Sequence, residues 1–441
     1  MKNLVEDGSK NVAVFINDFF PELPPALEKL SKKLGRPIQG VMLVDKTAHS
    51  RGKYHRDKNQ LFETIVCDFS DPAELRRTIK GLEEKLLLID ATSERSQPYF
   101  KLVVPHVPYL PTPTESSLEW ATHKGQMRAL VGAYRPALVP QVQVVRDDSE
   151  DTIATLLNGL RLPYIVKPTG LAASILVNKV STETELRETL QHSFEVIHDI
   201  YARNAGRWEP EMIVEEFIEG DMYSIDAYVN DIGKVWGLPP IRSKTAHSLG
   251  MEGFYTYQNE SYLEIDDTTV AAGQAAARDA IHALGLRSCV AHVELFHTAS
   301  GWKIIELGPR PGGYRQFMYA AAYGIDHAYN ELLLKIGLEP EIPTKAISYS
   351  LITNTYAEEE GTVEAIEGVE TARALGSVSN LWVHAKPGDL ASPSGKGGDL
   401  IVDSEMSNTS QEQLLADADK LRELIKIRTK QPAKNLIGSR S

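Results

Sequence analysis

The sequence predicts a multidomain protein that combines the α/β and α+β classes. At 441 residues the chain is too long for one ordinary hydrophobic core, so we expect two to four domains. Strand-like apolar runs alternate with helical segments over the first hundred residues, as in a parallel sheet flanked by helices. Beyond Ile347 the pattern changes to that of another α+β unit.

The N-terminal region predicts strands at 12–17, 38–45, 63–69 and 85–90. Helices are expected at 24–34 and 71–82. No G-x-G-x-x-G follows the first strand, which argues against a dinucleotide site there. A proline-rich stretch at 104–117 is typical of a linker, so we expect this α/β domain to span residues 1–112.

The middle of the chain, 113–345, predicts a second domain with a small lobe at about 160–230. A helix at 118–135 carries Lys124, and the strand at 164–168 contains Lys167, followed by a loop of small residues. The further expected elements are a strand at 175–180, a helix at 182–199, strands at 212–220 and 222–230, and a helix at 268–284. The segment 232–261 shows little periodicity and predicts an active-site loop.

Two glutamates are expected to face each other in a hairpin at 289–308. Its turn, Ala299 to Gly301, has glycine where a left-handed residue is needed. Folding the chain about Ser300 puts Glu294 opposite Glu306, with Val293, Leu295, Ile305 and Leu307 on the other face. Like charges directly opposite destabilise a sheet, so a cation is expected between them. An alternative is a pair of solvated glutamates, but the Pro-Arg-Pro-Gly-Gly that follows favours a site for Mg²⁺ or Mn²⁺.

The C-terminal region, 346–441, predicts an α+β lid or cap. Strands are expected at 347–355 and 379–385, a Ser/Gly-rich turn at 392–398, a strand at 400–403 and a final helix at 411–427.

Composition limits the classes of function. A net charge of −13 argues against a nucleic-acid partner. No apolar run is long enough to span a bilayer, and the acidic residues near the N-terminus argue against a secretory signal. Cys67 and Cys289 lie in apolar strands and are expected to be reduced thiols, which favours the cytoplasm. The oligomeric state stays open, a homodimer being the commonest assembly.

Lys124, Lys167, the strand Glu215-Glu216-Phe217-Ile218, Glu294, Glu306 and Arg310 occur in an order that resembles the ATP-grasp superfamily. Within it, the resemblance is to carboxylate–amine ligases such as L-amino-acid ligases, over roughly 104–345. It implies a Rossmann-like N-terminal domain, a two-lobed ATP-binding region and a C-terminal α+β cap.

The resemblance also implies roles for individual residues. Lys124 and Lys167 would contact the ATP phosphates, and the Glu215–Ile218 segment would meet adenine. Glu294 and Glu306 would hold Mg²⁺, and Arg310 would face the transferred γ-phosphoryl group. The remaining expected site residues are Gly170 and Ser174 in the phosphate loop, Asp221 near the ribose, Arg315 and the Gly312-Gly313 amides at a substrate carboxylate, and, in the 232–261 segment, Arg242, Lys244 and His247 near the substrate.

Three departures from the family pattern affect these roles. Gly308 stands where the family commonly has an asparagine ligand, and Met222 stands where an acidic residue often contacts the ribose. The phosphate loop, TGLAAS, has fewer glycines than is usual.

The implied reaction joins a small carboxylate, such as an amino acid, to an amine through an acyl phosphate, releasing ADP and phosphate. Alternatives are an ATP-grasp enzyme with another acceptor (a biotin carboxylase-like enzyme, or a purine-biosynthesis carboxylase or formyltransferase), a non-catalytic ATP-binding scaffold, and an α/β protein with no ATP site. The glycine-poor phosphate loop disfavours biotin carboxylase. The sequence leaves the acid and the amine open.

Overall fold

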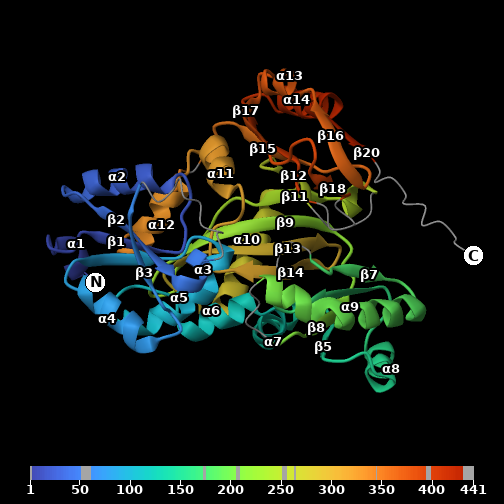
Figure 1. The fold of residues 1–441 in the computed structure, drawn as a ribbon, viewed down its shortest axis with the longest axis horizontal. Helices are drawn as coiled ribbons and strands as arrows, with labels where there is room; N and C mark the ends of the chain where they lie inside the picture. The colour runs from blue at the N-terminus through green and yellow to red at the C-terminus, as the bar shows by residue number, and fades with distance from the viewer. Residues whose placement is uncertain are drawn as a thin grey trace, which may run out of the picture.

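A computed structural model describes residues 2–50, 61–171, 175–204, 209–250, 256–262, 265–343, 345–393 and 399–430. The described chain combines helices and strands, and the strands form several sheets. Figure 1 shows these elements from the N-terminal region to the C-terminal unit. The fold class is therefore the expected one. Among the described helices, none is long and apolar enough to cross a membrane.

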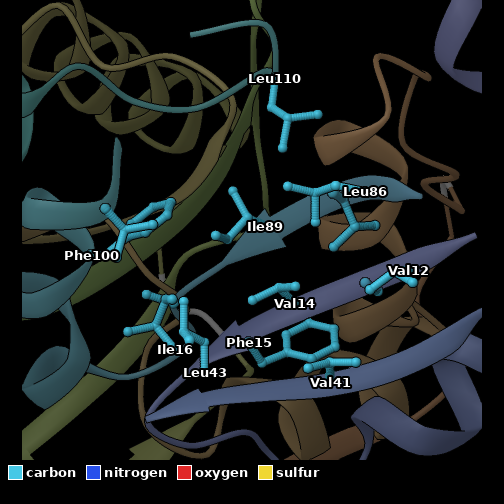
Figure 2. Packing of buried hydrophobic residues seen from close by; sticks show 14 of the residues in the cluster. Val12, Val14, Phe15, Ile16, Val41, Leu43, Leu86, Ile89, Phe100 and Leu110 are labelled. Carbon is cyan, nitrogen blue, oxygen red and sulfur yellow. The ribbon is translucent and has the colours of Figure 1, made fainter. Parts of the chain in front are cut away.

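The N-terminal region is a parallel sheet in the order β3-β2-β1-β4, as expected. Side chains of both faces are buried because helices cover the sheet. Figure 2 shows Val14, Phe15, Leu43 and Ile89 packed together in this core. The elements are α1 (Lys2–Glu6), β1 (Val12–Ile16), α2 (Leu23–Leu34), β2 (Gln39–Asp45), α3 (Lys46–Ser50), β3 (Glu63–Cys67), α4 (Pro72–Leu82), β4 (Leu86–Asp90) and α5 (Gln97–Val103).

The expected single helix at 118–135 is two helices, α6 (Glu115–Thr122) and α7 (Lys124–Tyr134). The chain breaks at His123, which adopts an extended conformation, and its Nδ1 accepts a hydrogen bond from the Gln126 amide at 3.2 Å. Histidine therefore caps α7 in the way that Ser or Asp usually does. The break places Lys124 in the first turn of α7.

A small antiparallel sheet follows, in the order β5-β8-β6-β7. It begins earlier than the expected 160, because β5 pairs with β8, and it ends at Glu216. Its elements are β5 (Val142–Val145), α8 (Glu150–Gly159), β6 (Tyr164–Pro168), β7 (Asn178–Val180), α9 (Glu183–Asn204) and β8 (Met212–Glu216).

The large sheet is antiparallel, in the order β14-β13-β9-β11-β12-β15-β19-β17, with β10 beside β9. Helix α10 packs on one face of its first strands, and α11 and α12 pack on the other face. The elements are β9 (Asp221–Val229), β10 (Val235–Gly237), β11 (Ile241–Thr245), β12 (Thr256–Glu260), α10 (Asp267–Ala283), β13 (Cys289–Thr298), β14 (Gly301–Gly308), α11 (Arg315–Tyr323), α12 (His327–Lys335), β15 (Tyr349–Thr355), β17 (Val378–Val383) and β19 (Val402–Asn408).

The expectation of a loop over 232–261 is wrong where this segment is described, because it contains β10, β11 and β12. The strands Ile241–Thr245 and Thr256–Glu260 are largely polar, yet Gln258, Asn259 and Glu260 are buried. Polar side chains on both faces of a strand hide the hydrophobic alternation from which strands are recognised.

The C-terminal unit does not separate cleanly at residue 345. Its strand β15 pairs with β12, so the large sheet runs through the expected boundary. A further small sheet, β18-β16-β20, lies beyond it (Figure 1). The remaining elements are β16 (Gly361–Glu367), α13 (Val369–Arg373), β18 (Leu390–Ala391), α14 (Gln411–Leu424) and β20 (Lys426–Lys430).

Candidate active site

The β13–β14 hairpin places Glu294 directly opposite Glu306, as expected. The expected three-residue turn is wrong, because Gly301 pairs with Thr298 and leaves only Ala299 and Ser300 in the loop. The register then shifts by one residue, so that Leu295 pairs with Ile304. Ile304 is therefore the buried core residue, and Ile305, which was expected in the core, lines a cavity instead. A β-bulge re-aims a side chain in this way because it adds one residue to one strand.

A cavity of about 310 Å³ lies between the small sheet and the large sheet. Its wall brings together nine of the residues that the sequence singled out, from segments up to 182 residues apart (306 − 124). They are Lys124, Lys167, Glu215, Glu216, Phe217, Ile218, His247, Glu294 and Glu306. Apolar residues complete the wall, among them Ile165, Val177 and Phe296, which the sequence did not single out, and Met222.

Lys124 lies between Glu306 and the loop that follows β6. Its Nζ lies 3.1 Å from Glu306 Oε1 and donates to the Leu171 carbonyl oxygen at 2.6 Å. Its backbone N–H donates to Thr169 O at 2.9 Å. A buried ammonium group thus lies beside Glu306 at the wall of the cavity.

Glu215 lies in a buried ion-pair network with Lys167 and Arg128. Arg128 Nε donates to Glu215 Oε2 at 2.9 Å, and Lys167 Nζ pairs with Glu215 Oε1. Arg128 Nη1 also donates to Ile304 O at 2.7 Å, so one guanidinium joins the small sheet to the large sheet. Burial alone would raise the pKa of Glu215, but the charges of Arg128 and Lys167 outweigh it and lower that pKa to about 2.

This lowered pKa predicts a pH dependence of stability. Glu215 has a pKa near 4.3 in an unfolded chain, so the unfolded state binds the extra proton between about pH 4.3 and pH 2. The stabilisation is therefore complete above about pH 5 and is lost as the pH falls toward 2. We expect Glu215→Gln to be less stable at pH 6 but to lose less stability on acidification than the wild type, as measured by urea unfolding at several pH values. Equal slopes for the two proteins would contradict the assignment.

The segment expected to meet adenine forms the end of β8 and the turn after it. The Phe217 ring lies edge-on to His247, with centroids 5.4 Å apart, and Lys179 Nζ lies 3.9 Å from its centroid. The structure thus places His247, expected near the substrate, on the wall of the cavity beside Phe217.

Arg310 is held by a residue that the sequence did not single out. Its Nε donates to Glu94 Oε2 at 2.7 Å, from the segment after β4. Burial would lower the pKa of Arg310, but Glu94 and then Glu294 and Glu306 raise it. A Cβ added to Gly308 would lie 3.1 Å from Glu94 Oε2, so this carboxylate stands beside the position where the family commonly has asparagine.

Arg315 is buried at the start of α11, 4% exposed. Among the described residues, the oxygen acceptors of its guanidinium are uncharged: Ser224 Oγ at 2.6 Å, Asn259 Oδ1 at 3.3 Å and Gly313 O at 3.0 Å. A buried guanidinium with uncharged acceptors is suited to bind an anion. By contrast, the Gly312 N–H, expected to be free for a substrate, donates to Asp226 Oδ2 at 2.9 Å.

Asp226 is the centre of a buried network that the sequence reasoning missed. Its Oδ1 lies 2.6 Å from His292 Nδ1, and its Oδ2 lies 2.8 Å from His327 Nε2. Burial would lower the pKa of His292, but the charge of Asp226 raises it. Strand alternation was an available signal, because His292 is two residues from Glu294 and must share its face.

Some expected site residues do not line the cavity. The Gly170 amide donates to Tyr201 Oη at 3.0 Å. Asp221 pairs with Arg242 at 3.0 Å. It lies on the face of β9 opposite to Met222, because neighbouring side chains of a strand alternate between the two faces. Lys244 likewise pairs with the buried Glu260 at 2.5 Å. Ser174 lies outside the described residues.

Glu294 and Glu306 fit a hard divalent cation. Both are oxygen donors on one face of the sheet, and both open into the cavity that holds the two lysines. Within the described part of the chain, no group of three or more His, Cys, Asp or Glu side chains forms a closed metal cage. Two carboxylates with the other positions left for phosphates and water are what Mg²⁺ prefers.

Two family patterns match the sequence. The ATP-grasp domain matches residues 160–316, and the L-amino acid ligase C-terminal domain 2 matches residues 355–430. The alanine–anticapsin ligase of Bacillus amyloliquefaciens is 27% identical over 51% of this chain and 49% of its own length. The D-alanine–D-alanine ligase of Chlorobium phaeovibrioides is 26% identical over 47% of this chain and 58% of its own. The chain thus spans about half the length of the curated relatives it matches.

Solved structures show the same fold over nearly the whole chain. L-amino acid ligase from Bacillus licheniformis has a TM-score of 0.77 at 18% identity, covering 96% of this chain and 99% of its own. Biotin carboxylase from Campylobacter jejuni has a TM-score of 0.62 at 13% identity, covering 95% and 92%. With both domain patterns in place, the chain contains an ATP-grasp domain and a C-terminal domain like that of L-amino acid ligases.

Proposed function

We propose that the protein joins a small carboxylate, such as an amino acid, to an amine with ATP, through an acyl phosphate. The observation that carries this proposal is the single cavity in which Lys124, Lys167, Glu294 and Glu306 meet, with Arg310 and Arg315 nearby. The L-amino acid ligase pattern at 355–430 supports a carboxylate–amine ligase over ATP-grasp enzymes that use another acceptor.

The chain's own residues would divide the work as follows. Lys124 and Lys167 neutralise the phosphates, and Phe217 with Ile305 and Phe296 packs on the base. Glu219 lines the cavity, unlike Asp221, and is our candidate for the ribose contact. Glu294 and Glu306 would hold Mg²⁺ or Mn²⁺, which neutralises charge on the terminal phosphates.

In the first step the substrate carboxylate oxygen attacks the γ-phosphorus, and the bond to the β-phosphate oxygen breaks, leaving ADP. Arg310 would stabilise the charge on the transferred group, and Arg315 would hold the carboxylate. In the second step the amine attacks the acyl carbon, phosphate leaves, and the amine loses its proton. Holding the reactants together supplies much of the acceleration.

Nucleotide product analysis tests this function. Purified protein is incubated with Mg-ATP and pooled amino acids and small carboxylates, beginning with alanine, which the names of two relatives contain. We expect ADP and phosphate to appear only when a substrate acid and an amine are present. AMP with pyrophosphate would overturn the acyl-phosphate route, and substrate-independent ADP would argue against ligation.

A further inference from the structure

We propose that His292 is a positioning residue that holds the Glu294 carboxylate in place for the metal and is itself oriented by Asp226. The inference rests on the function proposed above, because it takes Glu294 as a metal ligand. It adds a layer of side chains behind the two glutamates, none of which lines the nucleotide cavity.

The strand register builds this arrangement. In the pairing of β9 with β13, Asp226 lies directly opposite His292, and Ser224 lies opposite Glu294. His292 Nδ1 is 2.6 Å from Asp226 Oδ1, and His292 Nε2 is 3.4 Å from Glu294 Oε1. The imidazole therefore stands between two carboxylates, one on each side.

An ionised carboxylate only accepts hydrogen bonds, so the ring nitrogen of His292 that bonds Asp226 does so through its N–H, and the other ring nitrogen faces Glu294. A cation beside Glu294 reduces the repulsion between Glu294 and Glu306, which face each other across the hairpin. Side chains that orient a metal ligand commonly change metal affinity by about 10- to 100-fold when they are replaced.

Asp226 is in turn fixed from behind. Its Oδ2 accepts from the Gly312 N–H at 2.9 Å and lies 2.8 Å from His327 Nε2. The other ring nitrogen of His327 lies 2.8 Å from Tyr228 Oη, and both residues are fully buried. The orientation of the His292 ring is thus set by buried, hydrogen-bonded groups.

The loop before α11 packs directly on the His292 ring. A Cβ added to Gly312 would lie 2.4 Å from His292 Nδ1, whereas a Cβ added to Gly313 would meet nothing within 4 Å. Neither glycine has a positive φ. These neighbouring glycines therefore offer a matched pair, because only the first can push the ring away from Glu294.

Binding of Mn²⁺ to the protein with ADP, measured by electron paramagnetic resonance, tests the inference without turnover. We expect Mn²⁺ affinity to fall about 10- to 100-fold in His292→Asn, which can still donate to Asp226 but is too short for Glu294. The Mn²⁺ affinity of Gly312→Ala should also fall, and that of Gly313→Ala should match the wild type. His297→Gln, on the same strand but opposite Asp221, is the control for a histidine replacement.

The outcomes separate the two proposals. If Glu294→Gln weakens Mn²⁺ binding while His292→Asn and Gly312→Ala bind as tightly as the wild type, the positioning role is overturned and the metal site stands. If Glu294→Gln itself binds Mn²⁺ normally, the metal assignment fails and this inference with it. Should His292→Asn not fold, as judged by circular dichroism, Gly312→Ala carries the test.

Discussion

Glu306→Gln is expected to lower the rate of substrate-dependent ADP formation by about 10³-fold or more while the fold is retained. The change removes one negative charge and almost no volume. Glu306 faces Glu294 and accepts from Lys124 at 3.1 Å, so the loss affects both the proposed metal site and the phosphate-binding lysine. Several kcal/mol of transition-state stabilisation, at about 1.4 kcal/mol for each factor of ten, gives this magnitude.

Initial rates of ADP release, together with circular dichroism spectra, measure this effect. Glu339→Gln is the matched control, because Glu339 is an exposed glutamate paired with Lys234 on the surface. A rate near that of the wild type for Glu306→Gln would rule out Glu306 as a metal ligand.

Arg128→Met is expected to destabilise the protein by about 3–5 kcal/mol, the usual cost of removing one partner from a buried ion pair. Arg128 is 1% exposed, and its guanidinium binds both Glu215 of the small sheet and the Ile304 carbonyl of the large sheet. Without it, Glu215 keeps Lys167 as its partner, and the Ile304 carbonyl oxygen loses this buried donor.

Urea unfolding followed by fluorescence and circular dichroism measures this loss. Arg135→Met is the matched control, since Arg135 directly follows the same helix and pairs with Asp279 in a largely exposed position. Exposed pairs contribute about 0–1 kcal/mol, so the two variants should differ clearly. Equal losses in both would contradict a structural role for the Arg128–Glu215 pair.

The N-terminal parallel sheet and the Glu294–Glu306 pairing could be predicted from the sequence. Apolar strands buried on two faces read as continuous runs. Glu294 and Glu306 face each other as expected, although the register at the turn, with Thr298 opposite Gly301, would by itself put Glu294 opposite Ile305. The pairing therefore depends on the bulge at Ile305, which the turn residues do not predict and which places one side chain in the cavity wall instead of the core.

Other features arise from contacts between distant segments. Glu94 reaches Arg310 across 216 residues, and α12 packs on the N-terminal core although it lies between β14 and β15 of the large sheet in the chain. Strands β11 and β12 have a polar composition that conceals them until the sheet provides partners for Gln258, Asn259 and Glu260. The hydrophobic pattern within one segment carries no information on contacts with such distant segments.

The sequence by itself determined the order of the candidate site residues along the chain. It also determined the face that each shares with its strand neighbours, because alternation along a strand is a property of the backbone. Only the tertiary structure decided which charges meet. It pairs Asp221 with Arg242 away from the cavity, holds Arg310 with Glu94, and gives Arg315 uncharged acceptors. The physical reason is that electrostatic roles depend on distance and burial, which are set by the packing of sheets far apart in the chain.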